Sequence, residues 1–165
     1  MNIPSSIRNS LTKGPMDNQY FYNGSEMWER LCDVRDKKVP FIRQDMAMLA
    51  NAVELYYKGL IQSSGIKVDP HLLNTSHSLL ALTIEIENRI MPLSAPLTRT
   101  EDRDRRNFLN DLSNMYIGTR YNGVHADYDD FVACMDWAQK QIDLIKETLL
   151  PQINQDVDYA DEYDW

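Results

Sequence analysis

The sequence predicts an all-α protein, a five-helix antiparallel bundle of up-and-down topology. Three observations support this class. Apolar residues recur every three or four positions in five segments, which is the spacing of one face of a helix. Proline, glycine and serine separate those segments. No segment alternates apolar and polar residues with the period of two that marks a strand. With 165 residues, 43% of them hydrophobic, the chain can build one core and one domain.

The pattern of residues in the first part of the chain predicts an irregular N-terminal segment, the leader, followed by two helices. Residues 1–24 are rich in Asn, Ser and Gly and are expected to be irregular, with aromatic residues that dock on the body. The first helix is expected from Ser25, a suitable N-cap, to near Pro40. The second is the clearest and closes at the run Ser63-Ser64-Gly65. The apolar residues that share one face of this helix, which we call its stripe, are Ile42, Met46, Leu49, Val53, Tyr57 and Leu60.

Two further helices follow on the same reasoning. The third is expected to begin at residues 74–76 and to end before Pro92, because proline cannot continue the helical hydrogen bonds. The fourth is expected to begin at Thr100, which can cap it, and to end at Gly118. Their stripes comprise Leu79, Leu82, Ile86 and Ile90, and Phe108, Leu112, Met115 and Tyr116.

The fifth helix is expected to begin near residues 127–130 and to end at Pro151, so the helical domain spans residues 25–151. Its stripe alternates steps of four and three and suits a core seam and an oligomer seam equally. It comprises Phe131, Met135, Ala138, Ile142, Ile145 and Leu149. The remaining tail, residues 152–165, carries five acidic residues and no Lys or Arg, and is expected to be disordered.

Charge argues against a general nucleic-acid binder. The net charge is −8, and a sequence-blind binder would be expected to show a basic face. Arg99, Arg103 and Arg106 share one helical face, but acidic residues interleave with them and favour an ion-paired, solvated helix start. The acidic tail can solubilise the protein or engage a basic partner.

Other patterns limit location and chemistry. No run of about 18 apolar residues and no signal sequence is found, which predicts a cytoplasmic protein without a membrane partner. Cys32 and Cys134 stand far apart without a CxxC motif and are expected to be buried thiols. No cluster of carboxylates or histidines has metal-ligand spacing on one helical face, so neither a metal nor a cofactor is expected.

The strongest chemical pattern is Arg120 followed by His125, just past the expected end of the fourth helix. A guanidinium can clamp a phosphate and an imidazole can exchange a proton, as metal-independent phosphodiester cleavage requires. Without a metal, such cleavage is limited to RNA, whose 2′-hydroxyl is the nucleophile. In the alternative interpretation, Arg120 caps the helix carbonyls and His125 is a loop residue. Tyr121 could stack a base or simply pack.

Three charged or titratable residues lie on the second helix and at the start of the third. Glu54 and Lys58 are four positions apart on the second helix, which predicts a surface ion pair worth about 0.3–0.5 kcal/mol. His77, near the start of the third helix, is expected to hydrogen-bond its own first turn, with a site role as the alternative.

Several motifs resemble the HEPN (higher eukaryotes and prokaryotes nucleotide-binding) family between about Met27 and Leu149. Ala52-Val-Glu54-Leu-Tyr-Tyr-Lys58 is similar to the family's Ala-x-Glu-Lys-x-x-Lys segment. His77-Ser-Leu79 is similar to its His-x-Leu, and Tyr116-Ile-Gly-Thr-Arg120-Tyr121 to its Tyr-Ile-x-x-Arg-Tyr.

The resemblance implies two alternative functions. One is a toxin- or defence-type endoribonuclease that acts as a homodimer with Arg120 and His125 at its site, where Glu54 and Lys58 help to orient the arginine. Tyr121 occupies the position at which ribonuclease relatives usually carry a polar residue. The other is a non-catalytic nucleotide-binding or interaction module that partners a nucleotidyltransferase-like protein, which would be its antitoxin in a toxin–antitoxin pair. A plain interaction protein remains a third possibility.

Overall fold

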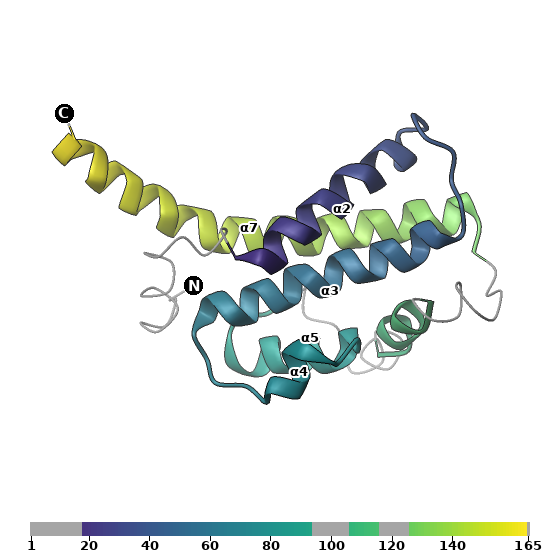
Figure 1. Ribbon diagram of the computed structural model, residues 1–165, viewed down its shortest axis with the longest axis horizontal. Helices are drawn as coiled ribbons and strands as arrows, with labels where there is room; N and C mark the ends of the chain where they lie inside the picture. The colour runs from purple at the N-terminus through teal and green to yellow at the C-terminus, as the bar shows by residue number, and fades with distance from the viewer. Residues whose placement is uncertain (1–17, 94–105, 116–125, 165) are drawn as a thin grey trace.

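The computed structural model describes residues 18–93, 106–115 and 126–164, with described side chains ending at Leu149. These residues form helices and no strand, which confirms the all-α class. The helices are α2 (Gln19–Arg35), α3 (Gln44–Ser64), α4 (Pro70–Asn74), α5 (Leu79–Arg89), a helical segment at residues 106–115, and α7 (Tyr128–Asp164) (Figure 1). The described residues thus hold six helical segments where five helices were predicted.

Helix α3 lies at the centre of the molecule because it is apolar on nearly every side. Helices α2, α5 and α7 all pack against it (Figure 1). Five of the six residues in its predicted stripe are buried, and only Ile42, which precedes the helix, is exposed. The helix ends where predicted, at Gly65, whose φ of 71° is the left-handed conformation that glycine adopts without a steric penalty.

Helix α2 begins at Gln19, so the expected irregular leader was wrong for residues 19–24, and Ser25 is not the N-cap. The cap is Asn18, whose side-chain oxygen accepts a hydrogen bond from the Phe21 amide at 3.0 Å. Phe21 is buried against α3, which anchors this first turn. The tertiary contact therefore places the N-cap seven residues before the predicted one, at Asn18 instead of Ser25.

A short helix that was not predicted, α4, precedes the third predicted helix, and the third helix itself begins later than expected. Asp69 caps the short helix α4, and Pro70 occupies its first position, where the missing N–H costs nothing. Helix α5 begins only at Leu79, with Ser78 as its N-cap, rather than at residues 74–76. Residues 106–115 of the fourth predicted helix are helical, and its expected ends at Thr100 and Gly118 lie outside the described residues.

The up-and-down order was wrong for α3 and α5, which run in the same direction. The start of α5 lies beside the middle of α3, where His77 contacts Glu54. Its end lies beside the segment that follows α3, where the Arg89 guanidinium donates to the Lys67 carbonyl oxygen at 2.7 Å. The α3–α5 connection, with α4 inside it, is long enough to return the chain (Figure 1).

Helix α7 also begins at the same end of the molecule as α3. The Tyr128 hydroxyl donates a hydrogen bond to the Arg35 carbonyl oxygen, and its ring packs edge-on against Phe41. All six residues of the α7 stripe are fully buried within the chain. The stripe is therefore a core seam.

Helix α7 does not end at Pro151 as predicted but continues to Asp164, so residues 152–164 are helical rather than disordered. A proline inside a helix removes one hydrogen bond and can bend the helix without ending it. Figure 1 shows this last part of α7 leading away from the bundle.

Candidate functional site

The residues predicted to form the site fall into two groups. Arg120, Tyr121 and His125 lie outside the described residues. The three supporting residues, Glu54, Lys58 and His77, are described and lie together. They come from the middle of α3 and from the residue that precedes the N-cap of α5.

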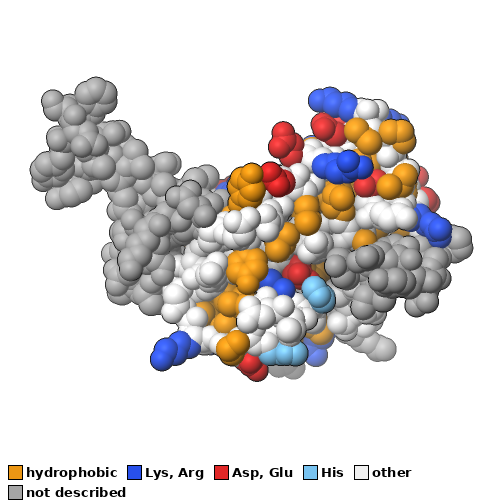
Figure 2. All heavy atoms as spheres, in the orientation of Figure 1, with side chains coloured by type: hydrophobic (Ala, Val, Ile, Leu, Met, Phe, Trp, Pro, Cys, Tyr) orange, Lys and Arg blue, Asp and Glu red, His pale blue; other side chains and the backbone are white. Residues whose placement is uncertain are grey.

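Glu54 connects the other two residues through its two carboxylate oxygens. Its Oε1 lies 2.8 Å from His77 Nδ1, and its Oε2 lies 3.3 Å from Lys58 Nζ. Figure 2 shows an acidic, a basic and a histidine side chain gathered on the face of the molecule above α3 and α5. We call Lys58, Glu54 and His77 the charged triad.

The expected surface ion pair of Glu54 and Lys58 is buried, which corrects the sequence prediction. The two side chains are only 7% and 5% exposed. The spacing of four residues predicted the contact but not the burial, because burial depends on what packs around α3. A buried charge is costly unless it is paired, so each of these two side chains needs the other.

His77 was expected to hydrogen-bond the first turn of its own helix, and this was wrong. Ser78 serves as the cap instead, since its hydroxyl accepts from the Ala81 amide at 3.1 Å. The His77 side chain turns to Glu54 and remains 50% exposed. The triad therefore runs from a buried ammonium group to an imidazole at the surface.

This arrangement suits an imidazole that must be held in one orientation. A carboxylate next to Nδ1 accepts its proton, which fixes the tautomer and directs Nε2 away from Glu54. His77 can thus bind an anion or transfer a proton, and Glu54 positions it for either task.

The link between His77 and Glu54 could not be inferred from spacing, since the residues are 23 positions apart. Only the resemblance to the family's motifs assigned Glu54, Lys58 and His77 to one site. That signal did not show which oxygen of Glu54 faces which partner.

The cysteines do not supply a reactive thiolate. Cys32 and Cys134 are free and partly buried rather than fully buried. Burial is the main cause that raises the pKa of the Cys134 thiol to about 11, and it also raises the pKa of Cys32. Both thiols therefore stay protonated near neutral pH, and a protonated thiol is a poor nucleophile.

The described residues offer no group of three or more His, Cys, Asp or Glu side chains placed to hold a metal ion. Within the same ranges, no helix combines the length and apolar composition that crossing a membrane requires. No protein-family model, curated protein or solved structure matches the chain.

Proposed function

We propose that the chain is a HEPN-type protein that acts as a metal-independent endoribonuclease, with Arg120 and His125 as its catalytic pair. The observation that carries the proposal is the charged triad, because two separate motif segments supply its members. The all-α architecture and the long central helix α3 agree with it. If Glu54 and Lys58 had formed only a surface ion pair, and His77 had only capped its own helix, the two motif segments would not have met in the structure.

The proposed reaction transfers one proton at each end of the scissile bond. A base removes the proton of the 2′-hydroxyl, the 2′-oxygen attacks phosphorus, and the bond from phosphorus to the 5′-oxygen breaks. His125 exchanges a proton with the attacking or the leaving oxygen. Arg120 binds the phosphate through its planar fork and stabilises the charge that develops on its oxygens. The products are a 2′,3′-cyclic phosphate and a 5′-hydroxyl.

The charged triad has a supporting role in this proposal. Glu54 holds His77 at the surface, where its imidazole can bind a substrate phosphate, and the fixed tautomer presents one defined nitrogen. Two such sites would face one groove in a homodimer. A nucleotidyltransferase-like antitoxin is the partner that fits a toxin of this class.

The test is RNA cleavage by the purified chain in the presence of EDTA. His125→Ala and Arg120→Ala should each lower the cleavage rate by about 10²- to 10⁴-fold, which is the usual contribution of acid–base or oxyanion groups. Circular dichroism should show unchanged helicity. His71→Ala is the matched control, because His71 is an exposed histidine on α4 that is not a member of the triad. Cleavage that persists in both variants would contradict the assignment.

The non-catalytic alternative is supported by Tyr121, which places an aromatic ring where a polar residue is usual in ribonuclease relatives. If the wild-type chain leaves RNA intact, ATP or GTP should raise its melting temperature in a concentration-dependent way. Melting curves unchanged by either nucleotide would count against this second function.

A further inference from the structure

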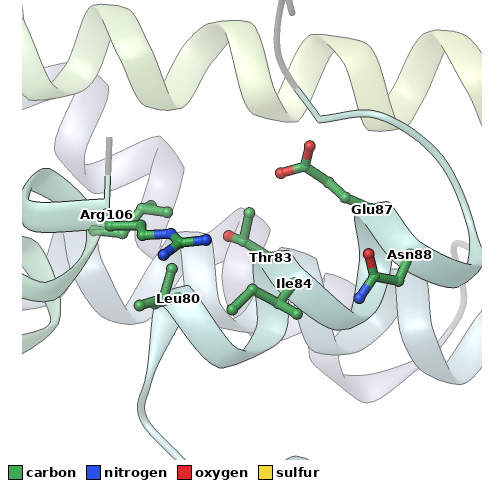
Figure 3. Close-up of a pocket in the computed structure, with 7 residues that line it drawn as sticks. Leu80, Thr83, Ile84, Glu87, Asn88 and Arg106 are labelled. Atoms are coloured by element: carbon green, nitrogen blue, oxygen red, sulfur yellow. The ribbon is translucent and has the colours of Figure 1, made fainter. Parts of the chain in front are cut away.

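A cavity of about 390 Å³ lies between α5 and the helical segment at residues 106–115. Figure 3 shows its walls. One side presents Leu80 and Ile84, and polar groups come from Thr83, Glu87, Asn88 and Arg106. The volume lies at the lower end of the range of about 300–1,000 Å³ that small-molecule sites occupy. None of these residues was assigned to a site by the sequence analysis.

The hydroxyl of Thr83 is the most informative group in this cavity. It is buried, the residue being only 2% exposed, and it has no hydrogen-bond partner. Hydroxyls on two other helical segments behave differently: Ser113 and Thr148 donate to carbonyl oxygens four residues earlier, at 2.9 and 2.8 Å. Leaving a buried hydroxyl unpaired lowers the stability of the fold, so a partner that enters from the cavity and accepts or donates a hydrogen bond would recover this energy.

The charged groups around Thr83 indicate the kind of partner. The Arg106 guanidinium extends towards the Thr83 hydroxyl (Figure 3). None of the ion pairs among the described residues involves Arg106. The guanidinium fork matches two oxygens of one oxyanion, and the hydroxyl can donate to one of them.

The rest of the wall limits the size and charge of the ligand. Ile84 is a large apolar side chain that is 46% exposed, so an apolar body can lie on it and on Leu80. Glu87 adds a carboxylate to the same wall and disfavours a dianion. A phosphate monoester carries about −1.5 to −2 charges at neutral pH, whereas a carboxylate carries one.

We infer that this cavity binds a small monocarboxylate with an apolar body. Its carboxylate hydrogen-bonds to Arg106 and Thr83, and its body packs on Leu80 and Ile84. This inference does not depend on the proposed ribonuclease chemistry.

The test uses benzoate as the probe and the full-length chain, with binding followed by amide chemical shifts in NMR titrations. Benzoate should bind with a Kd on the order of 1 mM or lower, as expected for a ligand of this size. Its shifts should centre on α5 and residues 106–115. Thr83→Val, which keeps the branched shape, and Arg106→Gln should each weaken binding at least about tenfold. Arg30→Gln, an exposed arginine on α2, is the matched control and should bind like wild type.

Two further probes separate the possible sources of binding. Benzyl alcohol keeps the ring but lacks the anion, and phenyl phosphate carries a dianion, so both should bind more weakly than benzoate. Benzyl alcohol binding as tightly as benzoate would overturn the proposal in favour of a merely apolar cavity. Equal binding by wild type, Thr83→Val and Arg106→Gln would also overturn it, as would the absence of shifts. Thr83→Val should melt no lower than wild type, because it removes an unpaired hydroxyl, so loss of binding cannot be attributed to unfolding.

Discussion

Replacing Glu54 by alanine is expected to lower the free energy of unfolding by about 3–5 kcal/mol, a large part of the stability of a domain of this size. The reason is that Lys58 Nζ is buried, and the pairing at 3.3 Å with Glu54 is the ion pair that balances its charge. Without the carboxylate, an ammonium group would remain in a low-dielectric interior. Urea denaturation followed by circular dichroism measures the loss directly.

Two comparisons show whether the unpaired charge is the cause. Glu29→Ala removes an exposed glutamate from α2 and should change the stability by no more than about 0.5 kcal/mol. The double variant Glu54→Leu with Lys58→Met removes both charges and should recover most of the stability, because buried ion pairs can be replaced by apolar residues of similar volume. A double variant as unstable as Glu54→Ala would show that the triad stabilises the fold by some means other than charge balance.

Gly59→Ala is expected to destabilise the fold by about 1–3 kcal/mol, although alanine is the better helix former by about 1 kcal/mol. A Cβ at Gly59 would lie 2.7 and 2.8 Å from two atoms of the Phe21 ring, closer than carbon atoms can approach. The ring is buried and rigid, so it cannot move aside cheaply. Thermal and urea denaturation of the variant measure the balance of the two effects.

The contact between α2 and α3 offers its own controls. At Gly24 an added Cβ would lie 3.2 Å from the Tyr56 ring, so Gly24→Ala should cost less than Gly59→Ala. Phe21→Leu removes ring atoms from the clash and should reduce the cost of Gly59→Ala in a double-mutant cycle. Full additivity of the two substitutions would mean that Phe21 is not the obstacle.

Apolar periodicity predicted what depends on local spacing. The stripes on α3 and α7 are core, and the α3 terminus lies at Gly65 as expected. The expected docking of aromatic residues from segment 1–24 holds for Phe21, which is buried. Periodicity could not predict that Phe21 docks on α3 and extends α2, since that contact joins residues far apart in the chain. Nor did it predict α4, because the five residues Pro70–Asn74 are too few to show a helical period.

In the charged triad, too, local spacing predicted one contact and tertiary packing determined the rest. The spacing of Glu54 and Lys58 predicted their contact, because residues four apart on a helix are neighbours. Burial of the pair and the approach of His77 arise from the packing of α5 against α3, which no local pattern encodes. The cavity at Thr83 was missed for the same reason, since it exists only where two helices meet.

The hydrogen bonds of Asn18 affect local unfolding at two helix ends. Besides capping α2, its side-chain amide donates to the Gly59 carbonyl oxygen at 3.1 Å and to the Ser63 hydroxyl at 2.8 Å. One residue thus connects the first turn of α2 to the last turns of α3. Fraying of the one end therefore exposes the other, so both should exchange their amide hydrogens with solvent deuterium as a single cooperative unit, unlike the independent helix termini of most bundles.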